Sequence, residues 1–378
     1  MQHLVLAGAG HAHVIALKLF GQTPIPAVRL TLVTREATTL YSGMLPGVIA
    51  GHYARAEAHI DTAALARFAG ARFIQDEVIG LDPKRGAILF RSGQPLPFDL
   101  LSLDIGSQPN AAYAPGTGSL PVKPIDSFLP RFDAMLAQTL SMGGKAHIAV
   151  VGAGAAGVEL MLATARRLRA EVSLAGHDPS GLLFTLITAT DDILPGFPPA
   201  FRTALRQSLV AETIGLRAGA IATHAADGVL RLAGGASIPA DHVLWTTEAA
   251  AAPWLRGTGL KLDEQGFVAV DACLNAVGHA NIFAAGDMAA FGPRVLPKSG
   301  VYAVCAGPAL AHNIRAYTAG ASLSPFRPQR DALCLLSTAD GRAVGTRNGL
   351  TVSGRWVWRC KDWIDRRFMA QFKNLPPR

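Results

Sequence analysis

Two glycine-rich turns carry the residue types and spacing in this sequence that could do chemistry. The first is GAGHAH, from Gly8 to His13, and the second is GAGAAG, from Gly152 to Gly157. In such a turn the first glycine permits a tight bend, the second lets the backbone approach a pyrophosphate, and the third lets helix and strand pack closely. Backbone N–H groups and a helix N-terminus then face the anion. The two turns therefore predict two dinucleotide sites.

The first turn departs from the pattern, because His13 stands where the third glycine is expected. Gly8 and Gly10 keep the phosphate-facing positions, so the histidine costs packing room rather than phosphate contact. Taken alone, this turn could also be an ordinary strand-to-helix corner. The complete second fingerprint and a later AAGD stretch, which ends in Gly286 and Asp287, favour nucleotide binding for both turns.

The elements that must position these turns occur twice. HLVLAGAGHAHVIAL lies at the start of the chain, and HIAVVGAGAAGVELML begins at His147. A helix-compatible stretch follows each copy, and then an apolar strand, which is 29–34 in the first copy and 182–188 in the second. Each copy is typical of a β-α-β unit. We therefore expect an α/β fold with two Rossmann-like dinucleotide-binding domains and a small C-terminal unit of β-strands and a helix.

Composition and charge agree with this fold class and limit the classes of partner that the chain could bind. At 378 residues the chain is too long for one core, and 39 glycines with 16% charged residues suit buried parallel strands and tight turns. The net charge is +8, and most of it lies from Arg355 onward, where seven Lys or Arg stand against two Asp. Such a segment indicates an acidic partner, for which nucleotide cofactors and an anionic membrane surface are better candidates than nucleic acid.

The four cysteines all lie in the last third of the chain, without CxxC pairs or zinc spacing. This usage predicts a reduced, cytoplasmic protein with no metal site. The first strand starts at His3, so we expect no signal peptide, and glycines and Glu159 interrupt the longest apolar run, so we expect no transmembrane helix. The cysteines are Cys273, Cys305, Cys334 and Cys360.

Two dinucleotide units followed by a strand that ends in Gly-Asp resemble the two-dinucleotide-domain flavoproteins of the pyridine nucleotide-disulfide oxidoreductase superfamily. The resemblance covers nearly the whole chain. Within the superfamily, GAGHAH, YSGMLPG, PKSGVYAV and the tail GRWVWRCKDWIDRRFMAQF are most similar to the FAD-dependent oxidoreductases associated with selenide, water dikinase, and the chain is also similar to type II NADH dehydrogenases. The resemblance implies an FAD-binding domain from residues 1–120 and 265–325, an inserted NAD(P)H-binding domain at 121–264, and a β-rich C-terminal unit at 326–378 that ends in a basic helix.

The resemblance also assigns residues to the cofactors. Gly8 and Gly10 would face the FAD pyrophosphate, and Asp287 would accept a hydrogen bond from a ribityl hydroxyl. Glu159, early in the second unit's helix, would lie near the nicotinamide dinucleotide. For Asp287 the alternative is a turn-forming role, and for Glu159 it is a charge that only stabilises the helix dipole. The other residues that we expect to bind a cofactor are His11, Thr34, Arg35, Met44, Pro46, Gly106, Gly152, Gly154, Gly157, Gly286, Lys298 and Gly300.

One lysine could act on the flavin directly. Hydride transfer from nicotinamide to flavin needs no acid or base from the protein, because the cofactors supply the reactivity. Lys298 lies in PKSG shortly after Asp287, and a cation there would stabilise an anionic reduced flavin. We therefore predict Lys298 as the catalytic residue, with a solvated surface lysine as the alternative. Tyr302, shortly after it, would help to wall the acceptor pocket.

Departures from the superfamily pattern limit the chemistry. Thr34 and Thr188 stand where an acidic residue usually binds the adenosine ribose, so the sequence does not choose between NADH and NADPH. Disulfide reductases need a cysteine pair beside the flavin, and no cysteine precedes Cys273, so that chemistry is excluded. Sulfide oxidation would need Cys305 and Cys334 to meet in space, and we disfavour it.

The C-terminal tail could decide the electron acceptor. If it is helical, its aromatic and apolar residues fall near one face and its cations largely elsewhere, which is typical of a basic amphipathic helix in a membrane interface. The alternative is a helix packed on the C-terminal unit with solvated cations. The apolar set is Trp356, Cys360, Trp363, Ile364, Phe368 and Phe372, and the cations are Arg359, Lys361, Arg366 and Lys373.

Together these features predict hydride transfer from NAD(P)H to FAD and then reduction of a second acceptor, for which a membrane quinone is our first choice. This would place the protein in the cytoplasm, with peripheral contact to the inner face of the membrane through residues 355–378. One alternative is electron delivery to a selenium or sulfur species, with a functional link to selenide, water dikinase. The other is a flavin-containing redox sensor or scaffold without turnover.

Overall fold

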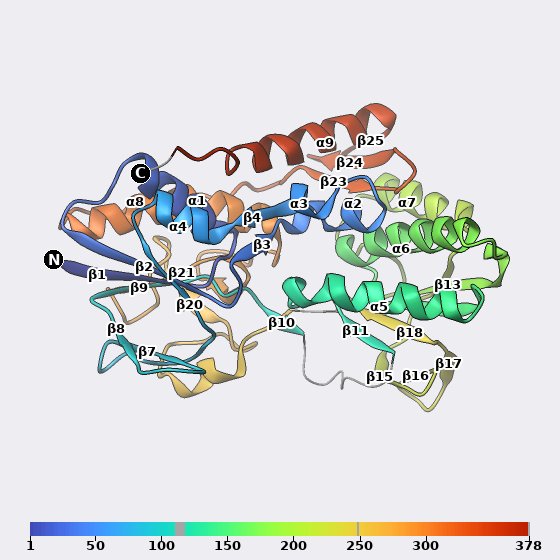
Figure 1. Cartoon of the computed structure of the whole chain (residues 1–378), viewed down its shortest axis with the longest axis horizontal. Coiled ribbons are helices and arrows are strands. Elements are labelled where there is room, and N and C mark those ends of the chain that lie inside the picture. Colours follow the sequence, from blue (N-terminus) through green and yellow to red (C-terminus); the bar gives the residue numbers. More distant parts are fainter. Residues whose placement is uncertain (110–117, 248, 377–378) are drawn as a thin grey trace.

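The computed structural model describes residues 1–109, 118–247 and 249–376, and within them two five-stranded parallel sheets form the framework (Figure 1). The first sheet has the strand order β21-β9-β1-β2-β5. Its central strand, β1, is buried along its whole length after the first residue, as expected for a parallel strand inside an α/β fold. The strands are β1 (Gln2–Ala7), β2 (Val28–Thr34), β5 (Arg72–Gln75), β9 (Leu100–Leu103) and β21 (Ile282–Ala284).

Two helices far apart in the sequence lie side by side over this sheet. They are α1 (His11–Gln22), which follows the first glycine turn, and α8 (Gly300–Thr318) (Figure 1). Gly307 permits their close crossing, because a Cβ atom there would lie 2.6 Å from the Cβ of Ile15. A shorter helix, α4 (Thr62–Phe68), packs against α1 as well.

The second sheet has the order β11-β18-β12-β13-β14, again with parallel neighbours. The long helix α6, which follows the second glycine turn, packs on β12 and β13. The strands are β11 (Ser119–Pro121), β12 (Ala146–Val151), β13 (Leu182–Ile187), β14 (Gly215–Arg217) and β18 (His242–Trp245), and the helices are α5 (Phe128–Ser141), α6 (Ala155–Leu174) and α7 (Pro199–Ala211).

The duplication seen in the sequence extends to individual hydrogen bonds. The carboxylate of Asp99, just before β9, accepts a bond of 2.6 Å from the N–H of His3 in β1. The carboxylate of Asp241, just before β18, accepts a bond of 2.7 Å from the N–H of His147 in β12. The acidic residue that opens each strand therefore ties that strand to its central neighbour in both units.

Smaller sheets, most of them antiparallel, and short helices connect or flank the strands of the two parallel sheets. The strands are β3 (Thr38–Leu40) with β4 (His59–Asp61), β6 (Val78–Asp82) with β7 (Ala87–Phe90) and β8 (Leu96–Pro97), β10 (Gln108–Pro109) with β19 (Ala249–Ala250), and β15 (Ala222–Ala226) with β16 (Val229–Leu232) and β17 (Ser237–Pro239). The pair β20 (Val268–Val270) and β22 (Ala289–Phe291) is parallel. The short helices are α2 (Leu45–Ile49), α3 (Arg55–Ala58), η1 (Ser42–Met44), η2 (Ile125–Ser127), η3 (Pro179–Gly181), η4 (Pro253–Gly257) and η5 (Gly286–Met288).

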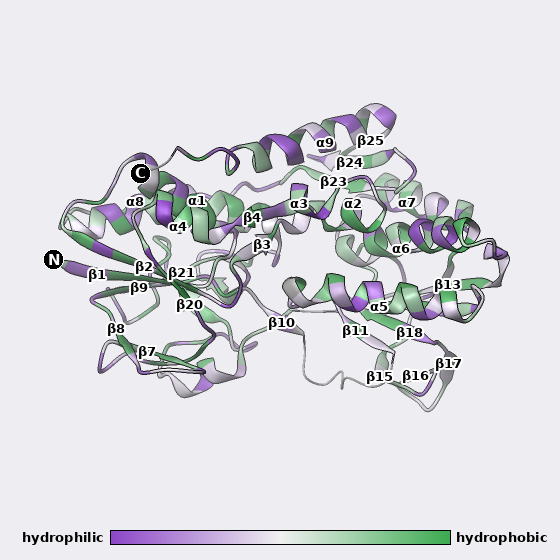
Figure 2. Cartoon of the chain, in the orientation of Figure 1, coloured by the Kyte–Doolittle hydropathy of each residue, from purple (hydrophilic) through white to green (hydrophobic). Residues whose placement is uncertain are grey.

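The C-terminal unit is a three-stranded antiparallel sheet followed by a helix, as the sequence predicts. It consists of β23 (Cys334–Ser337), β24 (Ala343–Arg347), β25 (Leu350–Gly354) and α9 (Arg355–Ala370). Helix α9 lies along the upper edge of the molecule in Figure 2 and is hydrophilic over much of its length.

The buried face of α9 differs from the predicted one. The helix packs through Val357, Lys361, Asp365 and Met369, which are four residues apart, so the expectation that Lys361 is a solvated cation is wrong. The predicted apolar face is divided: Phe372 is buried, whereas Cys360 is exposed. The two tryptophans of that face, Trp356 and Trp363, are 60% and 59% exposed.

Within the three described ranges, no helix combines the length and the apolar composition that crossing a bilayer requires.

Candidate active site

The first glycine turn connects β1 to α1 and is shaped by one carboxyl group. Gly8 has a φ of +93°, and a Cβ atom there would lie 2.3 Å from the carbonyl oxygen of Asp104. A Cβ atom at Gly10 would lie 2.2 Å from Oδ1 of the same aspartate. Only glycine therefore fits at either position, and α1 begins directly afterwards at His11.

His13 fills the space that a third glycine would leave between helix and strand. Its ring is fully buried, with Nδ1 2.6 Å from the carbonyl oxygen of Gly8 and Nε2 2.8 Å from Oγ of Ser102 in β9. Burial lowers the pKa of His13 to about 4, so the ring is neutral. Nδ1 must then donate to the carbonyl, and Nε2 accepts from the serine hydroxyl. The missing glycine is thus replaced by a hydrogen-bonded ring, and the turn keeps its shape.

Asp104, which the sequence analysis did not select, lies at the N-terminus of α1. Its Oδ2 accepts hydrogen bonds from the N–H groups of Ala12 at 2.9 Å and His13 at 3.0 Å. Burial raises the pKa of Asp104 to about 7, and the nearby charge of Asp287 acts in the same direction. The available signal was an acidic residue directly after the apolar strand LLSL.

The second glycine turn, between β12 and α6, has no such carboxyl group. Gly152 has a φ of +106°, and a Cβ atom at Gly157 would lie 1.7 Å from the carbonyl oxygen of Gly152. Thr246 occupies the place of Asp104 after β18, and its Oγ1 lies 2.9 Å from the carbonyl oxygens of Val151 and Gly152. A Cβ atom at Gly154 would meet nothing within 4 Å, so this turn has open space in front of its helix.

The AAGD stretch forms a turn that meets the first glycine turn. Gly286 has a φ of +69°, and a Cβ atom there would lie 2.2 Å from Oδ1 of Asp104. Oδ2 of the next residue, Asp287, lies 2.7 Å from Nζ of Lys123 and 3.3 Å from Oγ of Ser107. Lys123 comes from the proline-rich segment after β11, and its isolated position in the sequence carried no signal for this role.

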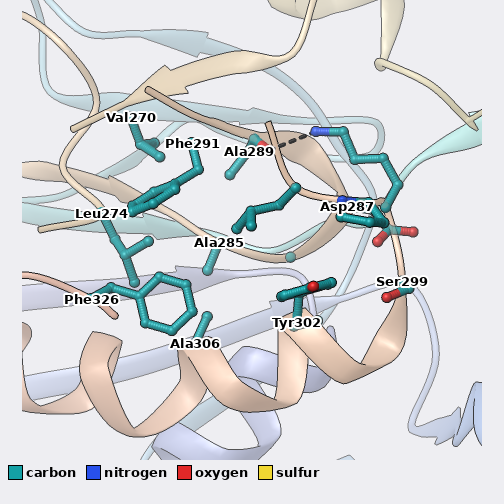
Figure 3. Close-up of a pocket in the computed structure, with 15 residues that line it drawn as sticks. Val270, Leu274, Ala285, Asp287, Ala289, Phe291, Ser299, Tyr302, Ala306 and Phe326 are labelled. Atoms are coloured by element: carbon teal, nitrogen blue, oxygen red, sulfur yellow. Dashed lines mark hydrogen bonds between the residues drawn. The ribbon is translucent and has the colours of Figure 1, made fainter. Parts of the chain in front are cut away.

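Lys298 lines the same cavity as Asp287 and Tyr302 (Figure 3). Its ammonium donates a hydrogen bond of 2.6 Å to the carbonyl oxygen of Ala289, the dashed line in Figure 3, and lies 3.9 Å from the ring centroid of Phe267. Burial lowers the pKa of Lys298. The alternative of a solvated surface lysine is therefore wrong, because the side chain is half-buried and has two partners.

The loop after β3 meets both α1 and α8. The rings of His11 and Tyr41 contact edge to face at 5.5 Å, and the N–H of Ser42 lies 3.4 Å from Nε2 of His11. Burial lowers the pKa of His11 to about 4. A Cβ atom at Gly300 would lie 2.9 Å from Oγ of Ser42, so the loop closes against the start of α8. The other predicted residues of this loop, both buried, are Met44 and Pro46.

The remaining residues predicted for FAD lie at strand ends. The carbonyl of Thr34 accepts a hydrogen bond of 2.9 Å from the N–H of Asp76, and the carbonyl of Arg35 accepts one of 3.1 Å from Nε2 of Gln75. Gly106 follows Asp104 by two residues, with a φ of +71° and open space where a Cβ atom would be. These positions border the first sheet at its carboxyl edge, where such sheets bind ligands.

The corresponding strand end of the second unit contains cations that the sequence analysis did not connect with it. Oγ1 of Thr188 lies 2.8 Å from Oγ1 of Thr190. Two residues later, the carboxylate of Asp192 pairs with Arg202, at 3.2 Å, and with Arg206, both from α7. The two arginines are therefore neutralised in part by an acidic residue of the same loop.

Glu159 is joined to the C-terminal unit by a hydrogen bond and an ion pair. Its Oε1 accepts a bond of 2.8 Å from the N–H of Ser337 and lies 3.9 Å from Nζ of Lys361. Burial raises the pKa of Glu159 to about 7. Nζ of Lys361 also donates to the carbonyl oxygen of Gly43 and to Oδ2 of Asp365, each at 2.8 Å. One buried ammonium thus joins α6, the loop after β3 and α9.

The four cysteines are free thiols, and burial raises the pKa of Cys334 to about 12. Among the described residues, no group of His, Cys, Asp and Glu side chains could hold a metal ion.

A model of the pyridine nucleotide-disulphide oxidoreductases matches residues 2–313 of this sequence. The chain belongs to that family. The superfamily inferred from the two glycine turns and the Gly-Asp turn is therefore confirmed.

Curated relatives align at low identity. The chain is 28% identical over 235 residues to a type II NADH:quinone oxidoreductase of Haemophilus influenzae, which covers 58% of this chain and 52% of that protein. It is 28% identical over 298 residues to demethylphylloquinone reductase NdbB of Synechocystis sp., which covers 75% of this chain and 71% of that protein. This chain therefore spans about half the length of the Haemophilus protein.

The fold also matches a solved structure over its whole length. NDH2 from Plasmodium falciparum, solved in complex with NADH, superposes with a TM-score of 0.80 at 13% identity, and the match covers 99% of each chain. This likeness confirms the predicted α/β fold with two Rossmann-like units.

Proposed function

We propose that this protein is an FAD-dependent oxidoreductase that passes a hydride from NAD(P)H to FAD and then reduces a quinone. The observation that carries the proposal is the presence of two glycine turns, each where a central parallel strand leads into a helix. Open α/β sheets bind nucleotides at this edge. The family and the names of the two curated relatives support it.

The first unit fits FAD. The positive end of the α1 helix dipole would face a pyrophosphate, and the carboxylate of Asp287, held by Lys123, can accept hydrogen bonds from the hydroxyls of a polyol. Bound FAD would supply the hydride chemistry, so the chain needs to orient it and to exclude water. Lys298, fixed in the cavity beside Asp287, remains our candidate for the charge near the flavin ring.

The second unit fits a nicotinamide dinucleotide. Gly154 leaves open space at the start of α6, and the first turn of that helix has no side-chain cap from its own N-cap residue. At the ribose end, Thr188 offers a hydroxyl instead of a carboxylate, and Arg202 and Arg206 are already paired with Asp192. The residues at this end therefore favour neither NADH nor NADPH strongly.

The outer face of α9 supports an acceptor in the membrane. Trp356 and Trp363 are exposed seven residues apart, and therefore on one side of the helix, and Leu350 and Val352 of the adjoining β25 are 75% and 42% exposed. Exposed arginines interrupt this apolar surface, a composition suited to lipid headgroups. They are Arg355, Arg359 and Arg367.

The first experiment is an anaerobic visible spectrum of the purified protein before and after NADH or NADPH. A flavin spectrum that bleaches with a nucleotide and returns when a quinone is added supports the whole proposal. Flavin that neither nucleotide reduces would point to the redox sensor, and reoxidation by a selenium or sulfur compound but by no quinone would point to the alternative acceptor.

A substitution of Gly154 by valine separates nucleotide binding from folding. The position has an unstrained φ of −72° and open space, so Gly154→Val should cost only the N-cap preference of α6 for glycine, about 1 kcal/mol in the free energy of unfolding. The valine side chain would occupy the space for the pyrophosphate, so we expect FAD to remain bound and bleaching by NADH to be lost. Gly257→Val is the matched control, since Gly257 is also open and lies in η4.

Membrane contact has its own test. The double variant Trp356→Ala with Trp363→Ala should no longer sediment with anionic liposomes, while its NADH-dependent bleaching stays as in wild type. The control is Leu174→Ala, which removes an 81% exposed apolar side chain at the end of α6. Equal sedimentation of the double variant and wild type would remove the lipid proposal and leave α9 as a packed helix.

A further inference from the structure

Asp104 is a buried carboxyl group at a position where a negative charge would disfavour the binding of a dinucleotide. It is 1% exposed and sits at the end of α1 that would face the FAD pyrophosphate. Two backbone donors of the first helical turn, on Ala12 and His13, are already bonded to its Oδ2. The negative charge of a carboxylate at this helix end would therefore repel a pyrophosphate.

The position of its second oxygen adds to the conflict. Oδ1 lies where it would be 2.2 Å from a Cβ atom at Gly10 and 2.2 Å from one at Gly286. It is therefore between the two turns that the proposed function assigns to FAD. In the second unit the equivalent residue, Thr246, is uncharged, and its hydroxyl lies against the carbonyls of Val151 and Gly152.

Within the described ranges, no Lys or Arg is among the groups that shift the pKa of Asp104, and the charged group that acts on it is Asp287 from η5. The residue bonded to it from α1, His13, is buried and neutral, because burial lowers the pKa of its ring to about 4. The ring of His11, at the start of the same helix, is neutral for the same reason. The ammonium of Lys123 lies 2.7 Å from the carboxylate of Asp287 and pairs with it.

We propose that Asp104 is a positioning residue that must carry a proton for FAD to bind, so that the protein takes up one proton for each FAD that it binds. The proton would sit on Oδ1, since Oδ2 accepts two backbone N–H groups. A neutral carboxyl group then closes the helix end without repelling the pyrophosphate. This inference rests on the proposed function, because it takes FAD as the cofactor of the first unit.

Proton uptake has a measurable consequence for affinity. Burial already raises the pKa of Asp104 to about 7. FAD would raise this pKa further, so below it the carboxyl group is ready for FAD, and above it a proton must be added first. The Kd for FAD should rise roughly tenfold for each pH unit above the Asp104 pKa. FAD itself contributes little to this trend, because its pyrophosphate stays ionised throughout.

The experiment is a titration of FAD into the full-length protein by calorimetry at about pH 8, in two buffers with different heats of ionisation. The difference in heat between the buffers gives the number of protons taken up, and we expect close to one. A Kd that does not change between about pH 6 and 8.5, with no proton uptake, would overturn the inference while leaving the FAD proposal intact. Failure to bind FAD at any pH would overturn both.

Variants identify the group that takes up the proton. Asp104→Asn keeps an oxygen for the two backbone donors and carries no charge, so we expect tight FAD binding that does not depend on pH, and no proton uptake. Asp104→Thr, which installs the residue of the second unit, gives a second test if the asparagine variant does not fold. Asp99→Asn is the matched control at the other end of β9 and should bind FAD with the wild-type proton uptake. Uptake that persists in either Asp104 variant would overturn the inference.

Discussion

The two glycine turns of this protein both lead from a central strand into a helix, but they differ in the side chains packed between that strand and that helix. In the first, the ring of His13 occupies the space between helix and strand and bonds to Gly8 and Ser102. In the second, Gly157 leaves no room for any side chain, and the residue that corresponds to Ser102 is Leu244, which can make no hydrogen bond with its side chain. A large residue is thus accepted at the third position where the neighbouring strand provides it with a polar partner.

The two turns also differ in the residue that follows the adjoining strand, β9 in the first unit and β18 in the second. Asp104 contributes a carboxyl group that bonds to the first turn of α1, whereas Thr246 turns its hydroxyl toward the strand and leaves open space at the start of α6. In the first turn a charged side chain therefore bonds to the start of the helix, whereas in the second turn a neutral hydroxyl bonds to the strand end.

The largest effect is expected at the glycine with the closest neighbour. A Cβ atom at Gly157 would lie 1.7 Å from a backbone oxygen, so α6 would have to move away from β12 in Gly157→Ala. We expect the free energy of unfolding to fall by about 3 kcal/mol in urea denaturation, with loss of NADH binding. Gly154→Ala, three residues earlier and in open space, should lose only about 1 kcal/mol, because Gly154 is the N-cap of α6. Equal stability of the two variants would contradict the packing argument.

The second-largest effect is a pH dependence of the free energy of unfolding, which arises from His13 in the first turn. The pKa of His13 is lowered to about 4 in the folded protein and is near 6.5 when unfolded, so its contribution to stability is complete above pH 6.5 and is lost as the pH falls toward 4. Between pH 6.5 and 4.5 this loss amounts to about 2 kcal/mol. In His13→Gln the amide can bond to the same partners and does not titrate. Over this pH range, the free energy of unfolding of the variant should therefore fall by about 2 kcal/mol less than that of wild type.

Urea denaturation of wild type and the glutamine variant at a series of pH values provides the measurement. The control is Ser141→Ala at the exposed end of α5, which removes no titratable group, so its fall with pH should be that of wild type. The same slope for wild type and His13→Gln would mean that burial does not lower the pKa of the ring.

The smallest effect is expected at the hydroxyl of the second turn. Thr246→Val keeps the shape of the side chain and removes a group that lies 2.9 Å from two carbonyl oxygens. We expect a loss of about 1 kcal/mol in the free energy of unfolding, and no dependence of that loss on pH. Thermal unfolding of Thr246→Val and of Thr223→Val, an exposed threonine of β15, would measure it. A pH-dependent loss would show that the two turns differ less than their residues indicate.

Much of the fold followed from local sequence pattern. The strand-turn-helix repeats predict both parallel sheets because apolar runs, glycine spacing and helical periodicity are all recorded within a few residues. The Gly-Asp turn and the C-terminal strands and helix were equally visible. The buried side of α9 was not, since it depends on Glu159 and on the loop after β3, which supply the partners that draw Lys361 inward.

The parts of the site that escaped prediction are pairs from distant segments. Lys123 meets Asp287 across 164 positions of the chain, and Asp104 meets Ala12 across 92. No periodicity encodes such contacts, because they depend on how the turns come together. Glu159 is a third case, since its Oε1 accepts a hydrogen bond from the N–H of Ser337 across 178 positions and pairs with Nζ of Lys361 at 3.9 Å.

Lys361 makes the last helix a mechanical brace. Its ammonium donates to the carbonyl of Gly43 in the loop after β3 and lies 3.9 Å from Oε1 of Glu159 in α6, so α9 fastens a loop of the first unit to the long helix of the second. A chain that ended before Arg355 would lose this cross-link, and only the other contacts, such as those of α2 with α6, would hold the two segments together.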